Sequence, residues 1–192
     1  MKKPLIRVTQ ILADNNMYPA WSQFPQVELE AKAALGTIVH RLCAGAGKGK
    51  WFDNDSPADA YVRQYVKWLK DSGAEVLRTE FTIRATIAGL KYIGHADLEL
   101  EWNREKWLVD IKTGAIYPAH PIQIAGYAAG VLKHHRRGIL QLTPRSARLI
   151  PMVDTGLADK RWEACCLLSK MRGLDHAKEL DKGKDHLQGI SG

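Results

Sequence analysis

Three charged residues stand close together in two neighbouring apolar stretches: Asp97 in GHAD, and Asp110 and Lys112 in DIK. Side chains two residues apart in a strand share a face, so Asp110 and Lys112 would point to the same side. Two carboxylates that converge repel each other unless a cation lies between them, and hard Mg²⁺ or Mn²⁺ prefers such ligands. A lysine beside that ion would orient or deprotonate an attacking water. The three residues predict metal-assisted hydrolysis of a phosphodiester bond.

The short Asp-Ile-Lys triplet also has a simpler interpretation. Such triplets occur often by chance, and on an exposed strand this one would be two ordinary solvent-facing charges. Its neighbours favour a site, because Trp107, Leu108, Val109 and Ile111 make the stretch apolar enough for a central strand. Charged side chains are costly in such a strand unless they are paired or bind a ligand.

Four further polar residues occur where such a site would use them. Glu80 lies in an alternating stretch before Asp97 and would complete the acidic cluster. His40 ends the run GTIVH in an expected helix. Gln123 and Tyr127 are four residues apart in QIAGY, so they would share one helix face. Each alone is compatible with packing, but together they indicate one site.

The spacing of apolar residues predicts the elements that must position these side chains. Helices are expected over about 27–44, from Pro57 to Gly73 behind a Ser56 cap, over 118–135 and over 157–180. Strands are expected over 75–87, 90–102 and 106–113 as an antiparallel meander, with two more within 139–152.

The turns of this meander determine which strand residues meet. They are expected at Gly89-Leu90 and Asn103-Arg104. The second turn would bring Asp97 within a residue or two of Asp110. The order of elements predicts an α/β fold with a central mixed sheet flanked by helices. The length predicts one domain over 1–192, with a flexible tail over about 182–192.

The motifs, taken in order, resemble a known family of nucleases. The runs GTIVH at 36–40, GHAD at 94–97, DIKTG at 110–114 and QIAGY at 123–127, with Glu80, resemble the RecB-like nuclease domain of the PD-(D/E)XK superfamily. Lambda-type phage exonucleases belong to the same superfamily. The opening VTQIL at 8–12 is also similar. The resemblance implies a restriction-endonuclease-like fold and a Mg²⁺-dependent deoxyribonuclease that Mn²⁺ would also support.

The resemblance also implies roles for individual residues. Asp97, Asp110 and the main-chain carbonyl of Ile111 would bind the metal ion, and His40 would complete or approach its shell. Lys112 would be the catalytic lysine.

Three more positions match the family's motifs, and one family feature is missing. Glu80 would support a second metal ion or a water, and Gln123 and Tyr127 would approach the scissile phosphate and the DNA backbone. Several relatives carry four cysteines that bind an iron-sulfur cluster, and no such set occurs here. We therefore expect no iron-sulfur cluster, with Cys165 and Cys166 as core residues. Because no GxxxxGK[ST] phosphate loop occurs, we expect no need for ATP.

The composition favours an acidic partner in a reducing compartment. Lys and Arg number 28 against 21 Asp and Glu, which gives a net charge of +7 and favours DNA, either linear duplex or single-stranded. The three cysteines form no CxxC pair, and no signal peptide or membrane span is evident. We expect a soluble protein of the bacterial or phage-infected cytoplasm.

Several loop and helix-end residues are candidates for contact with DNA. The run KHHRR at 133–137 is expected to end the QxxxY helix, where cations are also favoured by the helix dipole. Lys48 and Lys50 would track phosphates, and the loop aromatics Trp21, Trp51 and Phe52 would stack on bases or pack on the sheet.

The leading hypothesis is a DNA exonuclease of recombination, repair or phage DNA processing, with a recombination or strand-annealing protein as a conceivable partner. A structure-specific or flap endonuclease of the same fold is the nearest alternative. A noncatalytic DNA-binding protein on a nuclease fold is a second, although Asp97, Asp110 and Lys112 are all retained. A third is an unrelated basic α/β protein in which the motifs are coincidental.

Overall fold

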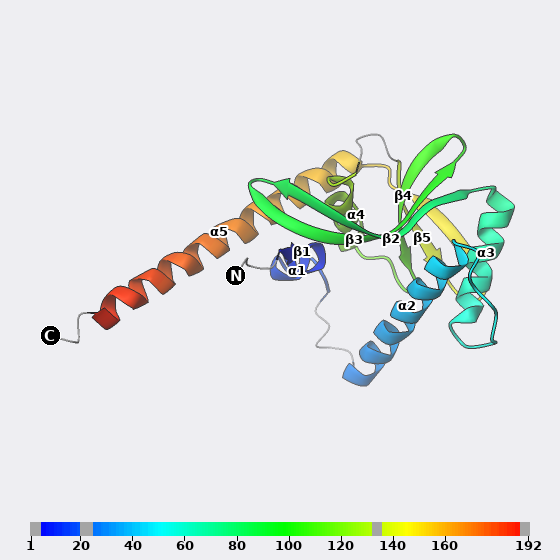
Figure 1. The fold of residues 1–192 in the computed structure, drawn as a ribbon, viewed down its shortest axis with the longest axis horizontal. Coiled ribbons are helices and arrows are strands. Elements are labelled where there is room, and N and C mark those ends of the chain that lie inside the picture. Colours follow the sequence, from blue (N-terminus) through cyan, green and yellow to red (C-terminus); the bar gives the residue numbers. More distant parts are fainter. Residues whose placement is uncertain (1–4, 20–24, 132–135, 189–192) are drawn as a thin grey trace.

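The central feature of the fold is one mixed sheet with helices on both faces (Figure 1). The computed structural model describes residues 5–19, 25–131 and 136–188, with side chains described as far as residue 173. In this part of the chain the sheet has six strands in the order β1-β3-β4-β5-β6, and β2 pairs with β3 beside this path. The predicted α/β fold, with a mixed sheet between helices, is confirmed.

The predicted antiparallel meander forms the middle of the sheet. It consists of β2 (Glu75–Ile87), β3 (Leu90–Trp102) and β4 (Glu105–Lys112). Two-residue turns join these strands, and both residues of each turn have positive φ, which matches the right-handed twist of the strands. The first turn is Ala88-Gly89, one residue earlier than predicted, and the second is Asn103-Arg104 as predicted.

Two short elements at the start of the chain were not predicted. Strand β1 (Ile6–Arg7) pairs in parallel with β3, and helix α1 (Val8–Asp14) follows it directly. Three residues of α1, Val8, Ile11 and Leu12, are buried. A two-residue strand and a two-turn helix are too short to show the periodicity on which the prediction depends.

One face of the sheet is covered by α2 (Gln26–Ala46) and α3 (Asp59–Ser72), close to the predicted helices. Helix α3 begins two residues after Pro57, and Ser56 Oγ accepts a hydrogen bond from the Asp59 N–H at 3.3 Å. Gly73 ends this helix in the left-handed conformation, as predicted. The core beneath the two helices contains Val39, Cys43, Val62, Tyr65, Leu98, Leu100, Val109, Ile111, Leu140 and Leu142.

The other face is covered by α1, α4 (Ala119–Ala128) and α5 (Thr155–Gln188). Trp162 of α5 donates from Nε1 to the Tyr92 hydroxyl at 3.1 Å, and that hydroxyl donates to the Gly126 carbonyl at 2.9 Å. These bonds satisfy polar groups in an otherwise apolar layer. Cys165 and Cys166 lie in this core, where they were predicted.

The helix after β4 is shorter than its sequence pattern predicts. It ends at Ala128 instead of near residue 135, so the run KHHRR does not form its C-terminus. Residues 133–135 lie outside the described part of the chain, and the two arginines begin β5 (Arg136–Leu142), which pairs with β6 (Ala147–Pro151). Arg136 pairs with Glu105 at 3.1 Å and Arg137 pairs with Asp159. Each arginine therefore has a carboxylate partner.

The last helix is longer than predicted. Helix α5 continues to Gln188, so residues 181–188 are helical, and it extends away from the sheet (Figure 1). The flexibility of the tail stays a prediction. Residues 189–192 lie outside the described part of the chain. Among the helices that are described, none is both long and apolar enough to cross a membrane.

Candidate functional site

The pairing of β3 is interrupted at Asp97 on both sides. The ladder between β2 and β3 skips Glu80 and Asp97, and the ladder between β3 and β4 stops one residue short of Asp97 and Asp110. Continuing each register by one step places Asp97 opposite Glu80 on one strand and opposite Asp110 on the other. Three acidic residues from three adjacent strands therefore meet at one point of the sheet.

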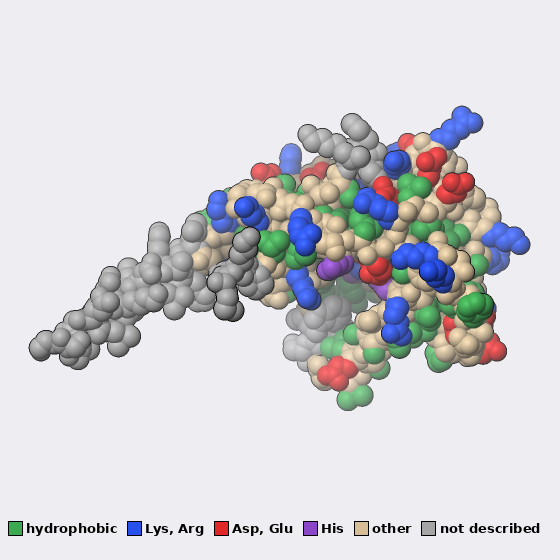
Figure 2. Space-filling view, in the orientation of Figure 1, with side chains coloured by type: hydrophobic (Ala, Val, Ile, Leu, Met, Phe, Trp, Pro, Cys, Tyr) green, Lys and Arg blue, Asp and Glu red, His purple; other side chains and the backbone are tan. Residues whose placement is uncertain are grey.

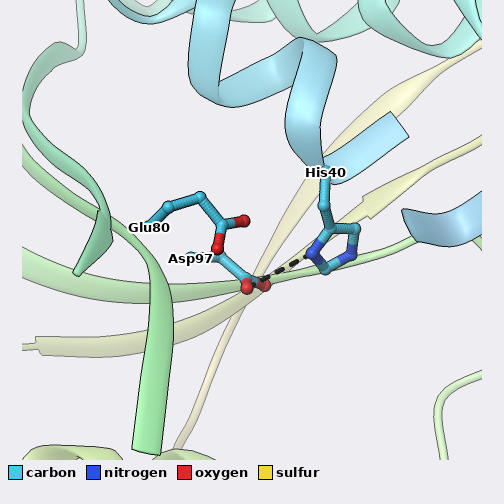
Figure 3. A group of neighbouring side chains, drawn as sticks. All are labelled: His40, Glu80 and Asp97. Carbon is cyan, nitrogen blue, oxygen red and sulfur yellow. Dashed lines mark ion pairs between the residues drawn. The ribbon is translucent and has the colours of Figure 1, made fainter. Parts of the chain in front are cut away.

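Glu80 contributes to this interruption through its backbone. Its φ is 47°, in the left-handed region, inside a strand that is otherwise extended. Such a conformation costs a non-glycine residue on the order of 1–3 kcal/mol and persists only where the surroundings enforce it. In Figure 3 the Glu80 side chain points toward Asp97 and His40. The strain thus accompanies the convergence of side chains from β2, β3 and α2.

Asp97 is held by one partner on each carboxylate oxygen. Its Oδ1 lies 3.2 Å from His40 Nδ1, and its Oδ2 accepts a hydrogen bond from the Ile111 N–H at 2.7 Å. Burial alone would raise the pKa of Asp97, but His40, Lys112 and this amide lower it below its usual value. For His40 the directions are reversed: burial alone would lower its pKa, but the negative charge of Asp97 raises that pKa above its usual value. Asp97 is therefore an ionised carboxylate in a fixed orientation.

His40, Glu80 and Asp97 form a group able to hold a metal ion. One potential ligand atom from each residue lies within 4.8 Å of the others (Figure 3). The three line a cavity of about 500 Å³ together with Gly36, Thr37 and Arg41 of α2. Burial and the nearby Asp97 raise the pKa of Glu80, as expected for carboxylates without a cation between them. The donor set of oxygens and one imidazole fits a divalent cation such as Mn²⁺ or Mg²⁺.

Gly36 has a role in this cavity that differs from the packing role its place inside a helix suggests. A Cβ at this position would lie 3.5 Å from Thr113 Oγ1, which is an ordinary contact. Close packing therefore does not require the glycine. Its missing side chain leaves space in the cavity beside His40.

Asp110 lies next to this group but is directed toward Lys112. Its side chain is 2% exposed, and its Oδ2 lies 2.6 Å from Lys112 Nζ. Among the described residues, Oδ2 accepts no hydrogen bond outside this ion pair. Burial raises the pKa of Asp110 to about 6, because the negative charge of Asp97 adds to the increase and the positive charge of Lys112 offsets only part of it. Lys112 therefore offsets only part of the cost of burying this carboxylate, and a second cation nearby would stabilise it further.

Lys112 connects the acidic group to α4. Its Nζ donates to Gln123 Oε1 at 3.4 Å, and Gln123 Nε2 donates to the Tyr127 hydroxyl at 2.6 Å. Burial alone would lower the pKa of Lys112, but Asp110 and Asp97 raise it above its usual value. Lys112 is therefore a protonated ammonium. The structure brings the predicted Gln123 and Tyr127 to it as a buried chain of hydrogen bonds.

The glycine of GHAD allows this chain to approach β3. A Cβ on Gly94 would lie 2.8 Å from Tyr127 Cε1, which is closer than such atoms pack, and 3.0 Å from Val8 Cγ2, which is a tight contact. We expect Gly94→Ala to destabilise the protein by about 1–3 kcal/mol, the usual cost of overpacking. The substitution should also shift Tyr127, and with it Gln123 and Lys112.

Thermal unfolding and a near-ultraviolet spectrum that reports on tyrosine would measure these effects. Gly173→Ala is the matched control, because a Cβ there meets no atom within 4 Å. A Gly94→Ala variant as stable as the Gly173→Ala variant would contradict this packing.

Ile111 has a defined place, but only part of its predicted role is visible. Its N–H donates a hydrogen bond to Asp97, and its backbone pairs in parallel with Leu140 of β5. Metal binding by its carbonyl stays a prediction.

Three residues near the site were not identified from the sequence. Arg41 lines the cavity with His40, and Tyr18 and His120 line a second cavity beside Lys112. His120 lies three residues before Gln123, so helical spacing could have indicated it. Arg41 directly follows His40, and adjacent residues do not share a helix face, so the spacing gave no signal for it. Tyr18 lies in an irregular segment after α1, and the sequence carries no signal for it.

Two of the loop aromatics differ in their surroundings. Trp51 packs against the core beneath α2 and α3 and donates from Nε1 to Asp59 Oδ1 at 2.8 Å, which favours the packing interpretation. Phe52 is 81% exposed, and Trp21 lies outside the described residues.

Binding of a divalent cation should stabilise the folded protein, because it would screen the repulsion among Glu80, Asp97 and Asp110. A ligand at a concentration 100 times its dissociation constant adds about 2.7 kcal/mol to the free energy of unfolding. For a chain of this size that corresponds to a rise in Tm of about 5–10 °C. Differential scanning fluorimetry with Mn²⁺ or Mg²⁺ would measure it. An Asp97→Asn variant should lose most of the shift, and an equal shift in both proteins would place the ion elsewhere.

Comparison with known proteins gives structural similarity without sequence similarity. No family model matches the chain, and no curated protein matches it. A candidate exonuclease from Eubacterium rectale is similar over 90% of this chain and 74% of its own, with 13% identity and a TM-score of 0.52. LHK-Exo, solved in complex with dAMP, is similar over 94% of each chain, with 14% identity and a TM-score of 0.49. At such identity, the likeness to the candidate exonuclease shows that this chain has a fold found in that protein.

Proposed function

We propose that this chain is a single-domain, metal-dependent DNA nuclease of the PD-(D/E)XK superfamily, related to its RecB-like and lambda-type members. The observation that carries the proposal is the junction of three strands at which Asp97, Asp110 and Lys112 lie together in the sheet. Asp110 is buried and Asp97 and Lys112 are partly buried, and ionisable groups gathered in such a place are costly for a fold and typical of a functional site. The structural similarity to a candidate exonuclease supports it.

Mg²⁺ is the ion that we propose for this site, with Mn²⁺ as a substitute. Asp97 and Asp110 would hold it, with His40 and the Ile111 carbonyl completing or approaching its shell. When bound, such an ion lowers the pKa of a water and neutralises charge on a phosphoryl oxygen. The second oxygen of Asp97 remains fixed by the Ile111 amide, which orients the carboxylate. Asp97 lies between Asp110 on β4 and Glu80 on β2, and there Glu80 would support a second ion or orient a water.

Lys112 would act as a fixed positive charge. Its raised pKa favours the ammonium form, so it stabilises negative charge that develops on the phosphate and does not remove a proton from water. Gln123 holds the ammonium from the α4 side, and Tyr127 holds Gln123. This arrangement keeps the lysine oriented before substrate binds.

DNA is the substrate that the charge of the protein favours. The chain carries a net charge of +7, and Figure 2 shows lysine and arginine side chains around the acidic and histidine side chains near the middle of one face. Such a distribution attracts the phosphate backbone while the acidic group stays available for a cation. The setting we propose is recombination, repair or phage DNA processing, in which a strand-annealing protein would be a suitable partner.

An assay with three substrates tests this function and its mode. The protein is incubated with end-labelled linear duplex, linear single-stranded DNA and closed circular duplex, each with Mg²⁺, Mn²⁺ or EDTA. We expect metal-dependent loss of nucleotides from linear DNA and an intact circle. Cleavage of the circle would indicate an endonuclease of the same fold. DNA binding without cleavage of any substrate would favour the noncatalytic alternative.

A further inference from the structure

His120 is a buried polar residue without a role in the proposed reaction. It is the second residue of α4, and its side chain is 7% exposed. It nevertheless lines a cavity of about 690 Å³ that also contains Lys112, Tyr18 and Thr113. Pockets of roughly 300–1,000 Å³ accommodate small ligands, so this space is sufficient for a nucleotide beside Lys112.

The backbone next to His120 determines which ring nitrogen carries the proton. The Tyr117 N–H lies 3.1 Å from His120 Nδ1 and donates to it. A backbone amide can only donate, so Nδ1 must be the unprotonated acceptor and the proton of the neutral ring is on Nε2. An edge contact with the Tyr117 ring, at 5.5 Å between centroids, also holds the imidazole. The tautomer is therefore fixed by local structure.

The environment keeps this ring neutral at physiological pH. Burial, together with the positive charge of Lys112, lowers the pKa of His120 to about 4. Nε2 has no hydrogen-bond partner among the described residues. It is also absent from the fully buried polar atoms without a partner, so it is accessible to a ligand. His120 thus offers one directed N–H donor that does not add a second positive charge next to the lysine.

We propose that His120 donates a hydrogen bond from Nε2 to a phosphate oxygen of the nucleotide beside Lys112 and so positions the substrate, an inference that rests on the proposed nuclease function. An anion is the matching ligand, because the donor lies near an ammonium and at the N-terminal end of α4, which favours negative charge. Lys112 contacts both Asp110 of the acidic group and Gln123 of α4. The phosphate would therefore lie between the acidic group and α4.

Two variants separate this role from a structural one. In His120→Asn the amide oxygen replaces Nδ1 as acceptor for the Tyr117 N–H, but no donor reaches the position of Nε2. In His120→Gln the amide nitrogen reaches that position, but the acceptor for Tyr117 is lost. Single-turnover cleavage of linear DNA should fall about tenfold in kcat/KM for His120→Asn and stay within about threefold for His120→Gln, with both proteins folded. A structural role requires the reverse order, and that order, equal losses or no losses would overturn the proposal.

A second measurement does not depend on cleavage. Nitrogen-15 spectra of the histidine rings should show His120 protonated on Nε2, and thymidine 5′-monophosphate should shift that signal. If the signal shifts while no DNA is cut, the phosphate contact stands and the nuclease function fails. If the signal does not shift although the nucleotide saturates the protein, the proposal is overturned even in an active nuclease.

Discussion

Replacing Lys112 with methionine is expected to reduce the rate of DNA cleavage by about 10³-fold, the usual effect of removing one fixed charge from a transition state. Methionine keeps the length and most of the apolar contacts of the side chain but removes the ammonium that lies 2.6 Å from Asp110. Binding of Mn²⁺ should persist or become tighter, because Lys112 competes with a cation for Asp110. Single-turnover rates and calorimetric titration with Mn²⁺ would measure the two effects.

The matched control for this substitution lies on the same strand. Lys106 of β4 is exposed, so Lys106→Met removes a lysine without changing the buried group. Its cleavage rate should stay within about twofold of the unmodified protein. A Lys112→Met protein that cuts DNA as fast as Lys106→Met would show that the ammonium takes no part in the reaction.

Replacing Asp110 with asparagine is expected to reduce cleavage at least as strongly. The substitution removes a charge that we propose binds the metal ion. A metal ion contributes several kcal/mol to stabilising the transition state, and about 4 kcal/mol corresponds to 10³-fold in rate. The affinity for Mn²⁺ should fall as well. Rates measured at several Mn²⁺ concentrations would separate weaker binding of the ion from slower chemistry at saturation.

Asp110→Asn should also change the pH dependence of stability in the metal-free protein. The raised pKa of about 6 means that Asp110 stabilises the fold when protonated and that this contribution is lost as pH rises from about 4 through about 6. Asparagine does not titrate, so the stability of the variant relative to the unmodified protein should rise between pH 4 and pH 8, by on the order of 1–2 kcal/mol.

Chemical denaturation at pH 4.5 and pH 8 would measure this difference. Asp71→Asn is the control, because Asp71 is an exposed residue that pairs with Lys67 at the end of α3. Its effect on stability should be small at both pH values. A relative stability of Asp110→Asn that does not rise between pH 4.5 and pH 8 would show that ionised Asp110 does not strain the fold.

The central strands could be predicted because their side chains alternate over long runs. The β2 and β3 boundaries match the prediction, and the positive φ of Asn103 and Arg104 shows why that turn was recognisable. The apolar pattern did not predict elements that are very short, and it misplaced the end of an element where further apolar residues follow that end. Helix α4 is the example, because Ala128 ends it although apolar residues continue beyond it.

The composition of the candidate site was more predictable than its geometry. The spacing of Asp97 and Asp110 about a short hairpin implied that they would be neighbours, and the register places them one step beyond the last pair. The sequence could not show that Asp110 is directed toward Lys112, or that Glu80 adopts a left-handed conformation. Those features depend on burial and on side-chain packing across three strands, which no local pattern encodes.

The most direct test of the metal-dependent site is the rate of linear DNA cleavage as a function of Mg²⁺ concentration. We expect a rate that saturates with Mg²⁺, disappears in EDTA and returns when Mg²⁺ is restored. Cleavage that is unchanged in EDTA, or a folded and DNA-binding protein that cuts nothing at any Mg²⁺ or Mn²⁺ concentration, would contradict the account.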